Sequence, residues 1–387
     1  MYSFINFTQG SNFQLNLYCF LLYSFLLLIS LKGNVTNLYL QKGNNTRTML
    51  LAGGLLIFAL SSFIGDDFFH YYEFMNEYRG HVYGDQERGL ELFYQYLIYY
   101  INGNYFVFRL VVWGGSLALI VIATRLFGAN VYHTLFVVLA GFIVTFAYAR
   151  ATLAMSVFSL GVVIICTANK HKKDIIKTII GLFIVVCSIY FHRSMLPMIL
   201  MAVGWFLLPW KKQLSKHSLW LFPIFVAIFA TILKFAFEEI LVAASSFEDE
   251  TGMLERAEFY SEQEALEHNT NGYIRLFLHY STYYLPLLLI ANTFRSNVVL
   301  QNVDKRAIDL YQIVYITCVF ATSFLFLDLE SDTLFYRYLY MAFIPMSILL
   351  AYLRDIGAIK KNQYLWVVVF LILSNLFQLF VAVYKEL

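Results

Sequence analysis

The sequence predicts an all-α, polytopic integral membrane protein with about twelve transmembrane helices. Hydrophobic residues make up 60% of the 387 residues and charged residues only 13%, whereas soluble proteins carry about a quarter charged residues. Several apolar runs contain 17 or more residues, the length that a helix needs to cross the hydrocarbon core of a bilayer. The loops also sort their charges by side. We therefore expect one transmembrane domain over residues 1–387.

Apolar segments follow one another along the whole chain. The first has no basic residue before it and no small-residue cleavage site, so we expect a retained helix and not a signal peptide. The predicted spans are residues 13–31, 48–64, 105–126, 132–148, 151–168, 175–191, 195–210, 219–242, 273–292, 307–327, 334–353 and 364–383.

The charges of the loops predict the orientation of these spans. If the spans alternate in direction, six loops share one side, and they contain 17 of the 27 Lys and Arg residues but only three acidic residues. The positive-inside rule makes this side cytoplasmic, so both termini are expected on the outer side. The six loops are residues 32–47, 125–131, 169–177, 211–217, 295–306 and 354–362.

The cations of the outer side are almost all arginine, and three acidic segments accompany them. The planar guanidinium binds phosphate or carboxylate groups in a bidentate manner, which the ammonium of lysine cannot do. We therefore expect a polar site that faces outward. The arginines at or near this side are Arg79, Arg88, Arg109, Arg150, Arg193, Arg256, Arg275 and Arg337.

The hairpin of the spans 151–168 and 175–191 is the centre of this prediction. Each span rises roughly 25–27 Å as a helix, about the thickness of one bilayer core. Because the basic turn between them lies at one face, Arg150, His192 and Arg193 come together at the other. Charges at the edge of a span indicate a functional site; the alternative is that the arginines only extend to lipid headgroups.

The first outer segment, residues 65–104, is rich in acidic and tyrosine side chains. An amphipathic pattern over residues 87–100 predicts an interfacial helix that carries Glu91. Asp66 and Asp67 are candidate functional residues. A metal site formed by these two residues and His70 would lack a firm ligand spacing. Tyr71 and Tyr72 also lie in this segment, where an interfacial aromatic belt explains most of the tyrosines.

The second outer segment, residues 243–272, is the longest polar stretch. An acidic helix in it would be either a lid over the site or a solvated connector. Arg275 begins the next span, and Arg337 lies about one turn inside the eleventh span beside Tyr338. An arginine at that depth requires an anionic partner, either Asp332 or a ligand phosphate. We find no nucleic-acid-binding signature and no glycine-rich phosphate loop.

Several of these motifs, in this order and on one side, resemble the EpsG family of bacterial polysaccharide polymerases related to the Wzy type. The resemblance extends over roughly residues 50 to 345. Members of the family commonly have Arg-Gln where this chain has Arg150-Ala151, so a role for that glutamine does not transfer. The residues that carry the resemblance are Gly65-Asp66-Asp67, Tyr71, Tyr72, Arg88 to Leu92 with Glu91, Arg150 to Met155, Phe191 to Ser194 and Arg337.

The resemblance implies a polymerase that joins oligosaccharide repeat units carried on polyprenyl pyrophosphate, at the outer face of the bacterial cytoplasmic (inner) membrane. No cofactor and no metal is expected. The expected partners are the lipid-linked oligosaccharide, the bilayer, a chain-length regulator and a flippase. Three alternatives share parts of the pattern: a lipid-linked oligosaccharide flippase, an O-antigen ligase and a membrane acyltransferase.

The predicted mechanism assigns a role to each candidate residue. Arginines would stabilise charge on the pyrophosphate leaving group, and His192 would deprotonate or orient the attacking sugar hydroxyl. Asp66 and Asp67 are alternatives for the second role, or they bind sugar hydroxyls. The pyrophosphate ligands are Arg150, Arg193 and Arg337, and the remaining substrate contacts are Tyr71, Tyr72, Glu91, Arg275 and Tyr338.

Overall fold

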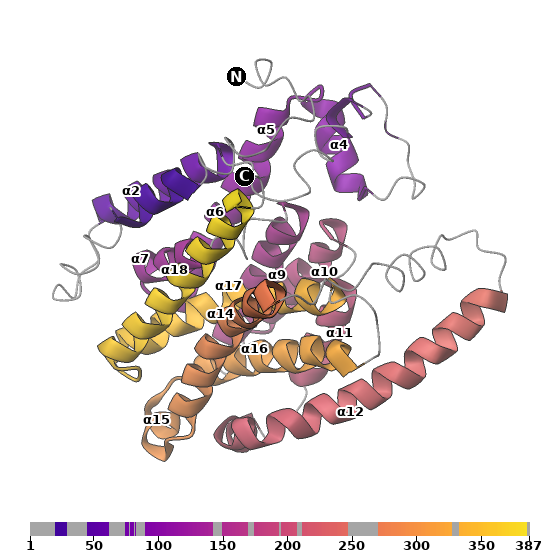
Figure 1. Ribbon diagram of the computed structural model, residues 1–387. Coiled ribbons are helices and arrows are strands. Elements are labelled where there is room, and N and C mark those ends of the chain that lie inside the picture. The colour runs from indigo at the N-terminus through magenta and orange to yellow at the C-terminus, as the bar shows by residue number, and fades with distance from the viewer. Residues whose placement is uncertain are drawn as a thin grey trace.

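The computed structural model is an assembly of helices (Figure 1). Among the residues that it describes, no strand occurs, and the predicted all-α class is confirmed. Asp66, Asp67, His70, Tyr71, Tyr72 and the proposed lid lie outside the described residues. The described residues are 20–28, 45–61, 74–76, 78–80, 82, 90–141, 149–168, 174–192, 195–206, 211–246, 270–326 and 333–384.

Most of the helices lie in the predicted apolar segments. A π-helical turn, η2, joins α5 to α6, and short 3-10 turns follow α10 and α16. In chain order the elements are α2 (Asn45–Ser61), α4 (Leu92–Tyr100), α5 (Tyr105–Arg109), η2 (Leu110–Gly114), α6 (Gly115–Phe127), α7 (Val131–Ala140), α9 (Ala149–Ala168), α10 (Ile175–Cys187), η3 (Ser188–Tyr190), α11 (Met195–Phe206), α12 (Lys211–Ser246), α14 (Thr270–Phe294), α15 (Asn297–Asn302), α16 (Lys305–Ser323), η4 (Phe324–Phe326), α17 (Thr333–Asp355) and α18 (Lys361–Tyr384).

Four stretches of the described chain are long and apolar enough to cross a bilayer: Tyr105–Phe127, Arg150–Ala168, Gln213–Phe235 and Lys305–Phe326. Shorter apolar helices lie in other predicted spans. The 12 residues of α11, for example, rise only about 18 Å. The structure therefore agrees with a helical membrane protein, while the count of twelve spans stays a prediction. The shorter helices are Thr46–Leu60, Val131–Ala140, Ile175–Tyr190, Met195–Gly204 and Lys361–Phe377.

The core lies where α9, α16 and α17 pack together (Figure 1). Nearly every residue of α16 and the described side chains of α17 up to Leu353 are buried. Helix α12 runs along the outside of the bundle and packs on α16. Buried hydroxyls join these two helices: Tyr311 donates to Ser218 Oγ at 2.6 Å. Such polar contacts and close packing hold helices together in lipid, where the hydrophobic effect between them is absent.

Three boundaries differ from the sequence prediction. Residues 211–217 were expected to be a cytoplasmic loop, but they form the first turns of α12. A polar helix remains hydrogen-bonded in water, so nothing forces a helix to end where the hydrocarbon ends. Residues 297–302 of another expected loop form the short helix α15. The predicted interfacial helix begins at Leu92, five residues later than expected.

Helices α9 and α10 approach each other closely through two glycines. A Cβ on Gly181 would lie 2.6 Å from Ile165 Cγ1 and 2.9 Å from the carbonyl oxygen of Gly161. Only glycine allows this approach of two backbones. The helices are antiparallel, and eleven residues separate Gly161 from Arg150 and Gly181 from His192. The crossing therefore places Arg150 and His192 at the same level.

We expect the substitution Gly181→Val to destabilise the protein by about 1–3 kcal/mol, because the added side chain overpacks this crossing. It should also reduce activity, since it separates the helices that carry Arg150 and His192. Thermal unfolding of the purified protein would measure the first effect. The matched control is Gly53→Val, because a Cβ on Gly53 meets no atom within 4 Å. Equal stability of the two variants would contradict this account.

Candidate functional site

The turn that precedes α4 positions a buried glutamate. Glu91 is the N-cap residue of α4 with extended backbone, and its side chain makes no capping hydrogen bond. Its carbonyl oxygen accepts the N–H groups of Tyr94 and Gln95, and the amide of Gln95 donates to the carbonyl oxygen of Leu90 at 2.8 Å. The backbone is thus held on both sides of Glu91, and its carboxylate is available for other partners.

Aromatic side chains attach α4 to the hairpin of α9 and α10. The rings of Phe93 and Phe191 lie 4.5 Å apart, and the ring of Tyr94 packs against Phe108 of α5 at 6.0 Å. The hydroxyl of Tyr94 donates to the carbonyl oxygen of Arg150 at 3.2 Å. Phe191 precedes His192 in sequence, so these contacts bring α4 directly beside the two residues that the sequence analysis places together.

The carboxylate of Glu91 joins these two residues. One oxygen, Oε2, lies 3.0 Å from the guanidinium of Arg150. The other oxygen, Oε1, lies 3.0 Å from Nδ1 of His192. The side chain of Glu91 is 7% exposed, whereas those of Arg150 and His192 keep 23% and 16%. Glu91 is therefore the buried centre of the cluster, and the two basic residues present its accessible surface.

The environment of Glu91 keeps it ionised. Burial alone would raise the pKa of its carboxyl, but the hydrogen bond with His192 and the positive charge of Arg150 outweigh this effect and lower the pKa to about 2. An ionised carboxylate only accepts hydrogen bonds. The hydrogen of a neutral His192 ring is thus on Nδ1, which leaves the lone pair on Nε2, the arrangement that an imidazole base requires.

This pKa also predicts how stability depends on pH. The pKa of Glu91 is lower in the folded protein than the usual 4.5, so its contribution is complete above pH 4.5 and is lost as the pH falls toward 2. At pH 7 the contribution is on the order of 3 kcal/mol. Unfolding of the native protein and of Glu91→Gln should therefore differ most near neutral pH, and the difference should shrink as the pH falls from about 4.5 toward 2. A constant difference would contradict the prediction.

The structure confirms that Arg150 and His192 lie together and adds Glu91 between them. Glu91 was expected to bind substrate, whereas its carboxylate is already engaged by two protein side chains. Arg193 lies outside the described residues. Arg337 lies in the second turn of α17, as expected, and Arg275 lies in the second turn of α14.

Tyr338 differs from its expected role in substrate binding. Its side chain is 8% exposed, and its ring stacks on Phe324 at 5.0 Å and meets the edge of Phe320 at 4.9 Å. These are the contacts of a core residue between α17 and the end of α16. The sequence did not distinguish this tyrosine from a substrate-facing one, because both kinds occur at span ends.

Sequence reasoning missed the residues that hold α4 in place. Phe93 and Tyr94 belong to the predicted apolar stripe of the interfacial helix, but the stripe does not name the surface on which it packs. Gln95 is 2% exposed within that helix, but it lies outside the predicted apolar stripe, so the pattern gives no signal of its burial. Arg109 was noted only as an arginine near the outer edge, and it donates to the carbonyl oxygen of Ala59 at the end of α2.

The described part of the chain contains no group of three His, Cys, Asp or Glu side chains that would hold a metal ion. The site is instead a carboxylate between an arginine and a histidine. An arginine stabilises negative charge on a phosphate oxygen, and an oriented imidazole accepts a proton from a hydroxyl. The arrangement is suited to transfer reactions that release an anionic leaving group.

No curated protein matches the chain, and neither does any solved structure. The model of one protein family, however, matches residues 46–387, which include every described residue of the site. The chain therefore belongs to the EpsG family, a family of Wzy-type polysaccharide polymerase-like proteins.

Proposed function

We propose that this protein joins oligosaccharide repeat units, carried on polyprenyl pyrophosphate, into a surface polysaccharide at the outer face of the bacterial cytoplasmic membrane. One observation carries the proposal: a buried carboxylate holds an arginine and a histidine together where two spans end, in a member of a polymerase-like family. The alternating topology, with both termini outside, is part of the proposal. It puts the site on the side that has no nucleotide sugars.

In the proposed reaction a hydroxyl of the acceptor unit attacks the anomeric carbon of the donor unit. The bond between this carbon and the pyrophosphate oxygen breaks, and polyprenyl pyrophosphate leaves with the electron pair. Nε2 of His192 accepts the hydroxyl proton, and Arg150 stabilises the charge on the leaving group, with Arg193 and Arg337 as further ligands of the pyrophosphate. The energy comes from the donor bond, so no other activated compound is consumed.

Glu91 has a positioning role in this mechanism. Because it accepts from Nδ1, it fixes the tautomer of His192 and favours the imidazolium that forms when Nε2 takes the proton. Its second oxygen orients the guanidinium of Arg150. Asp66 and Asp67 remain candidates for binding sugar hydroxyls, and Tyr71 and Tyr72 for stacking on sugar rings. A chain-length regulator and a flippase are the proposed protein partners.

The test uses a host strain that lacks this gene and is complemented with the native protein or with Arg150→Ala at equal membrane abundance. Arg125→Ala is the matched control, because Arg125 is exposed at the end of α6. Surface glycans and lipid-linked glycans are resolved by gel and mass spectrometry. We expect native ladders with the control, and single repeat units without a ladder with Arg150→Ala.

Other patterns would overturn the proposal in distinct ways. Single units that accumulate on the lipid carrier inside the cell would identify a flippase. Ladders that form on the carrier without reaching their acceptor would identify a ligase. Full ladders with Arg150→Ala would reject the site.

A further inference from the structure

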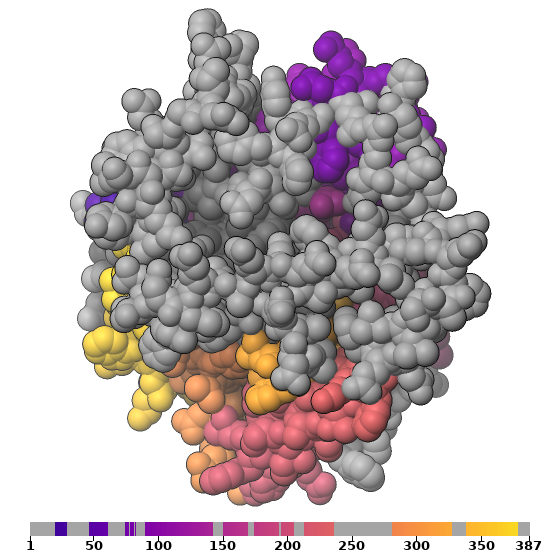
Figure 2. Space-filling view, turned by 45° about the vertical axis from the view of Figure 1, so that its right-hand side comes forward, coloured from indigo at the N-terminus to yellow at the C-terminus, as the bar shows by residue number. Residues whose placement is uncertain are grey.

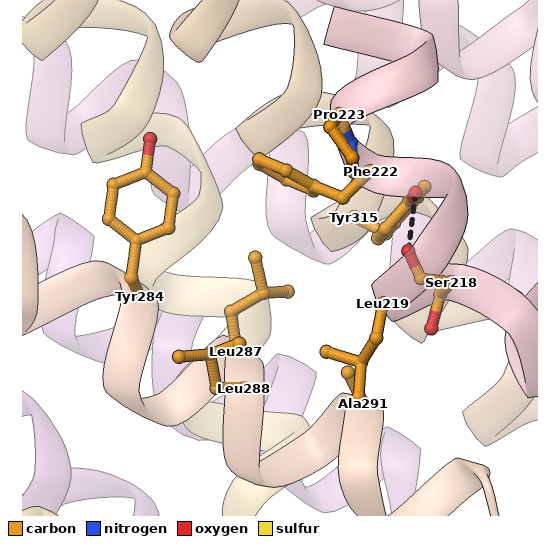
Figure 3. A pocket seen from close by; sticks show the side chains of 9 residues that line it. All are labelled: Ser218, Leu219, Phe222, Pro223, Tyr284, Leu287, Leu288, Ala291 and Tyr315. Atoms are coloured by element: carbon orange, nitrogen blue, oxygen red, sulfur yellow. Dashed lines mark hydrogen bonds between the residues drawn. The ribbon is translucent and has the colours of Figure 1, made fainter.

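A small cavity lies between α12, α14 and α16, apart from the Glu91 site. It has a volume of about 110 Å³. In the space-filling view α12 lies at one end of the molecule and the segment around α4 at the other (Figure 2). The side chains that line the cavity converge on a common space (Figure 3). They are Ser218, Leu219, Phe222, Pro223, Tyr284, Leu287, Leu288, Ala291 and Tyr315.

The few polar groups of the cavity already have partners. The hydroxyl of Tyr315 donates to the carbonyl oxygen of Ser218 at 2.9 Å (Figure 3). The hydroxyl of Tyr284 lies 2.5 Å from that of Thr322, and Ser218 Oγ accepts from Tyr311. The walls thus offer carbon surface and few polar atoms in need of a partner. Apolar cavities of about 150 Å³ take up benzene, so this one has room for a short length of hydrocarbon chain.

The cavity opens on the lipid-facing side of the bundle. Leu288 on α14 is 49% exposed, and Ile224 and Ile228 on α12 are exposed beyond it. In a membrane protein such a surface contacts hydrocarbon, so the space is continuous with the bilayer. A chain from the bilayer that enters it recovers the dispersion contacts that an empty cavity lacks.

Basic side chains flank the same end of the cavity. Arg295 follows Ala291 by four residues at the end of α14, and Lys216 precedes Leu219 by three residues near the start of α12, so each lies one turn beyond the lining on the same helix face. Helix α15 contacts both helices at this end. Within the described residues, the structure gives neither side chain a hydrogen bond or an ion pair.

We infer that this cavity binds one acyl chain of an anionic phospholipid of the cytoplasmic leaflet, with its phosphate on Lys216 and Arg295. The two cations belong to Lys- and Arg-rich segments that face the cytoplasm in the proposed topology. Trp220, which is 72% exposed one turn beyond Lys216, marks the level of the membrane interface. A lipid headgroup at this level places its acyl chain directly at the cavity. The headgroup of the polyprenyl donor lies at the opposite face.

The test measures lipid binding to the purified full-length protein by native mass spectrometry, with dioleoyl phosphatidylglycerol, dioleoyl phosphatidylcholine and polyprenyl phosphate as probes. Each basic side chain near a membrane surface strengthens binding of an anionic lipid about fivefold. We therefore expect phosphatidylglycerol to bind one site about 30-fold more tightly than phosphatidylcholine. Lys216→Gln with Arg295→Gln should remove this preference and leave acyl-chain binding in place.

Two further variants test the cavity itself. Ala291→Phe fills it, and Leu288→Trp covers its exposed mouth without a change in the core; each should abolish the saturable site for both phospholipids. Ile228→Trp is the control, because Ile228 is exposed on α12 and does not line the cavity. The inference is overturned if Leu288→Trp still binds phosphatidylglycerol at one site, or if polyprenyl phosphate is preferred. Lipid binding is measured without turnover, so the result is independent of the proposed polymerase activity.

Discussion

Replacing His192 with alanine is expected to lower the rate of repeat-unit polymerisation about 100- to 10,000-fold, the usual contribution of a general base. The ring is held by the carboxylate of Glu91 through Nδ1 at 3.0 Å, so its other nitrogen is the acceptor for the hydroxyl proton. Alanine removes this acceptor, while the arginine that stabilises the leaving group remains. A residual rate above that of the empty membrane is therefore expected.

The rate is best measured with purified protein in lipid vesicles and a synthetic lipid-linked repeat unit. His217→Ala is the matched control, because this exposed histidine lies near the start of α12. An unchanged rate with His192→Ala would exclude the histidine as the base.

Glu91→Gln is expected to reduce the rate by at least about 100-fold, although Glu91 itself does not contact substrate in the proposed mechanism. In serine proteases the equivalent change, from carboxylate to amide beside the histidine, costs about 10⁴-fold, because the histidine takes the wrong tautomer. The neutral amide of glutamine also carries no negative charge to balance the positive charge of Arg150. We expect the loss mainly in kcat, with a small change in KM.

A purely structural role for Glu91 would give a different result. In that case the variant would lose folded protein in proportion to its activity, and the remaining folded fraction would turn over normally. The double variant Glu91→Gln with His192→Ala separates the two cases: if Glu91 acts through His192, the double variant is no slower than His192→Ala alone. If instead the rate loss of the double variant equals the product of the two single losses, the two residues act independently.

Part of this site follows from the sequence. The two spans on either side of the basic turn have nearly equal lengths, so residues at their far ends must emerge on the same face of a bilayer. The convergence of Arg150 and His192 therefore follows from the equal lengths of these two spans. The tight crossing at Gly161 and Gly181 refines it by setting both residues at one level.

The position of Glu91 does not follow from the lengths of the spans. Its helix lies outside the spans, and an amphipathic stripe shows that a helix packs without showing on what. The contacts of Phe93 with Phe191 and of Tyr94 with Arg150 join residues that are 98 and 56 positions apart in the chain. No local pattern encodes pairs of this kind.

The sequence by itself determines that this protein is helical and apolar and that it belongs to its family, and it predicts that the basic loops face one side, because span length, composition and charge are local properties of a chain. Only the tertiary structure decides that Glu91 bridges Arg150 and His192, that Tyr338 is a core residue, and that a cavity remains beside α12. These features depend on which helix faces meet, and in a membrane this choice is made by the fit of glycines, rings and hydroxyls between helices.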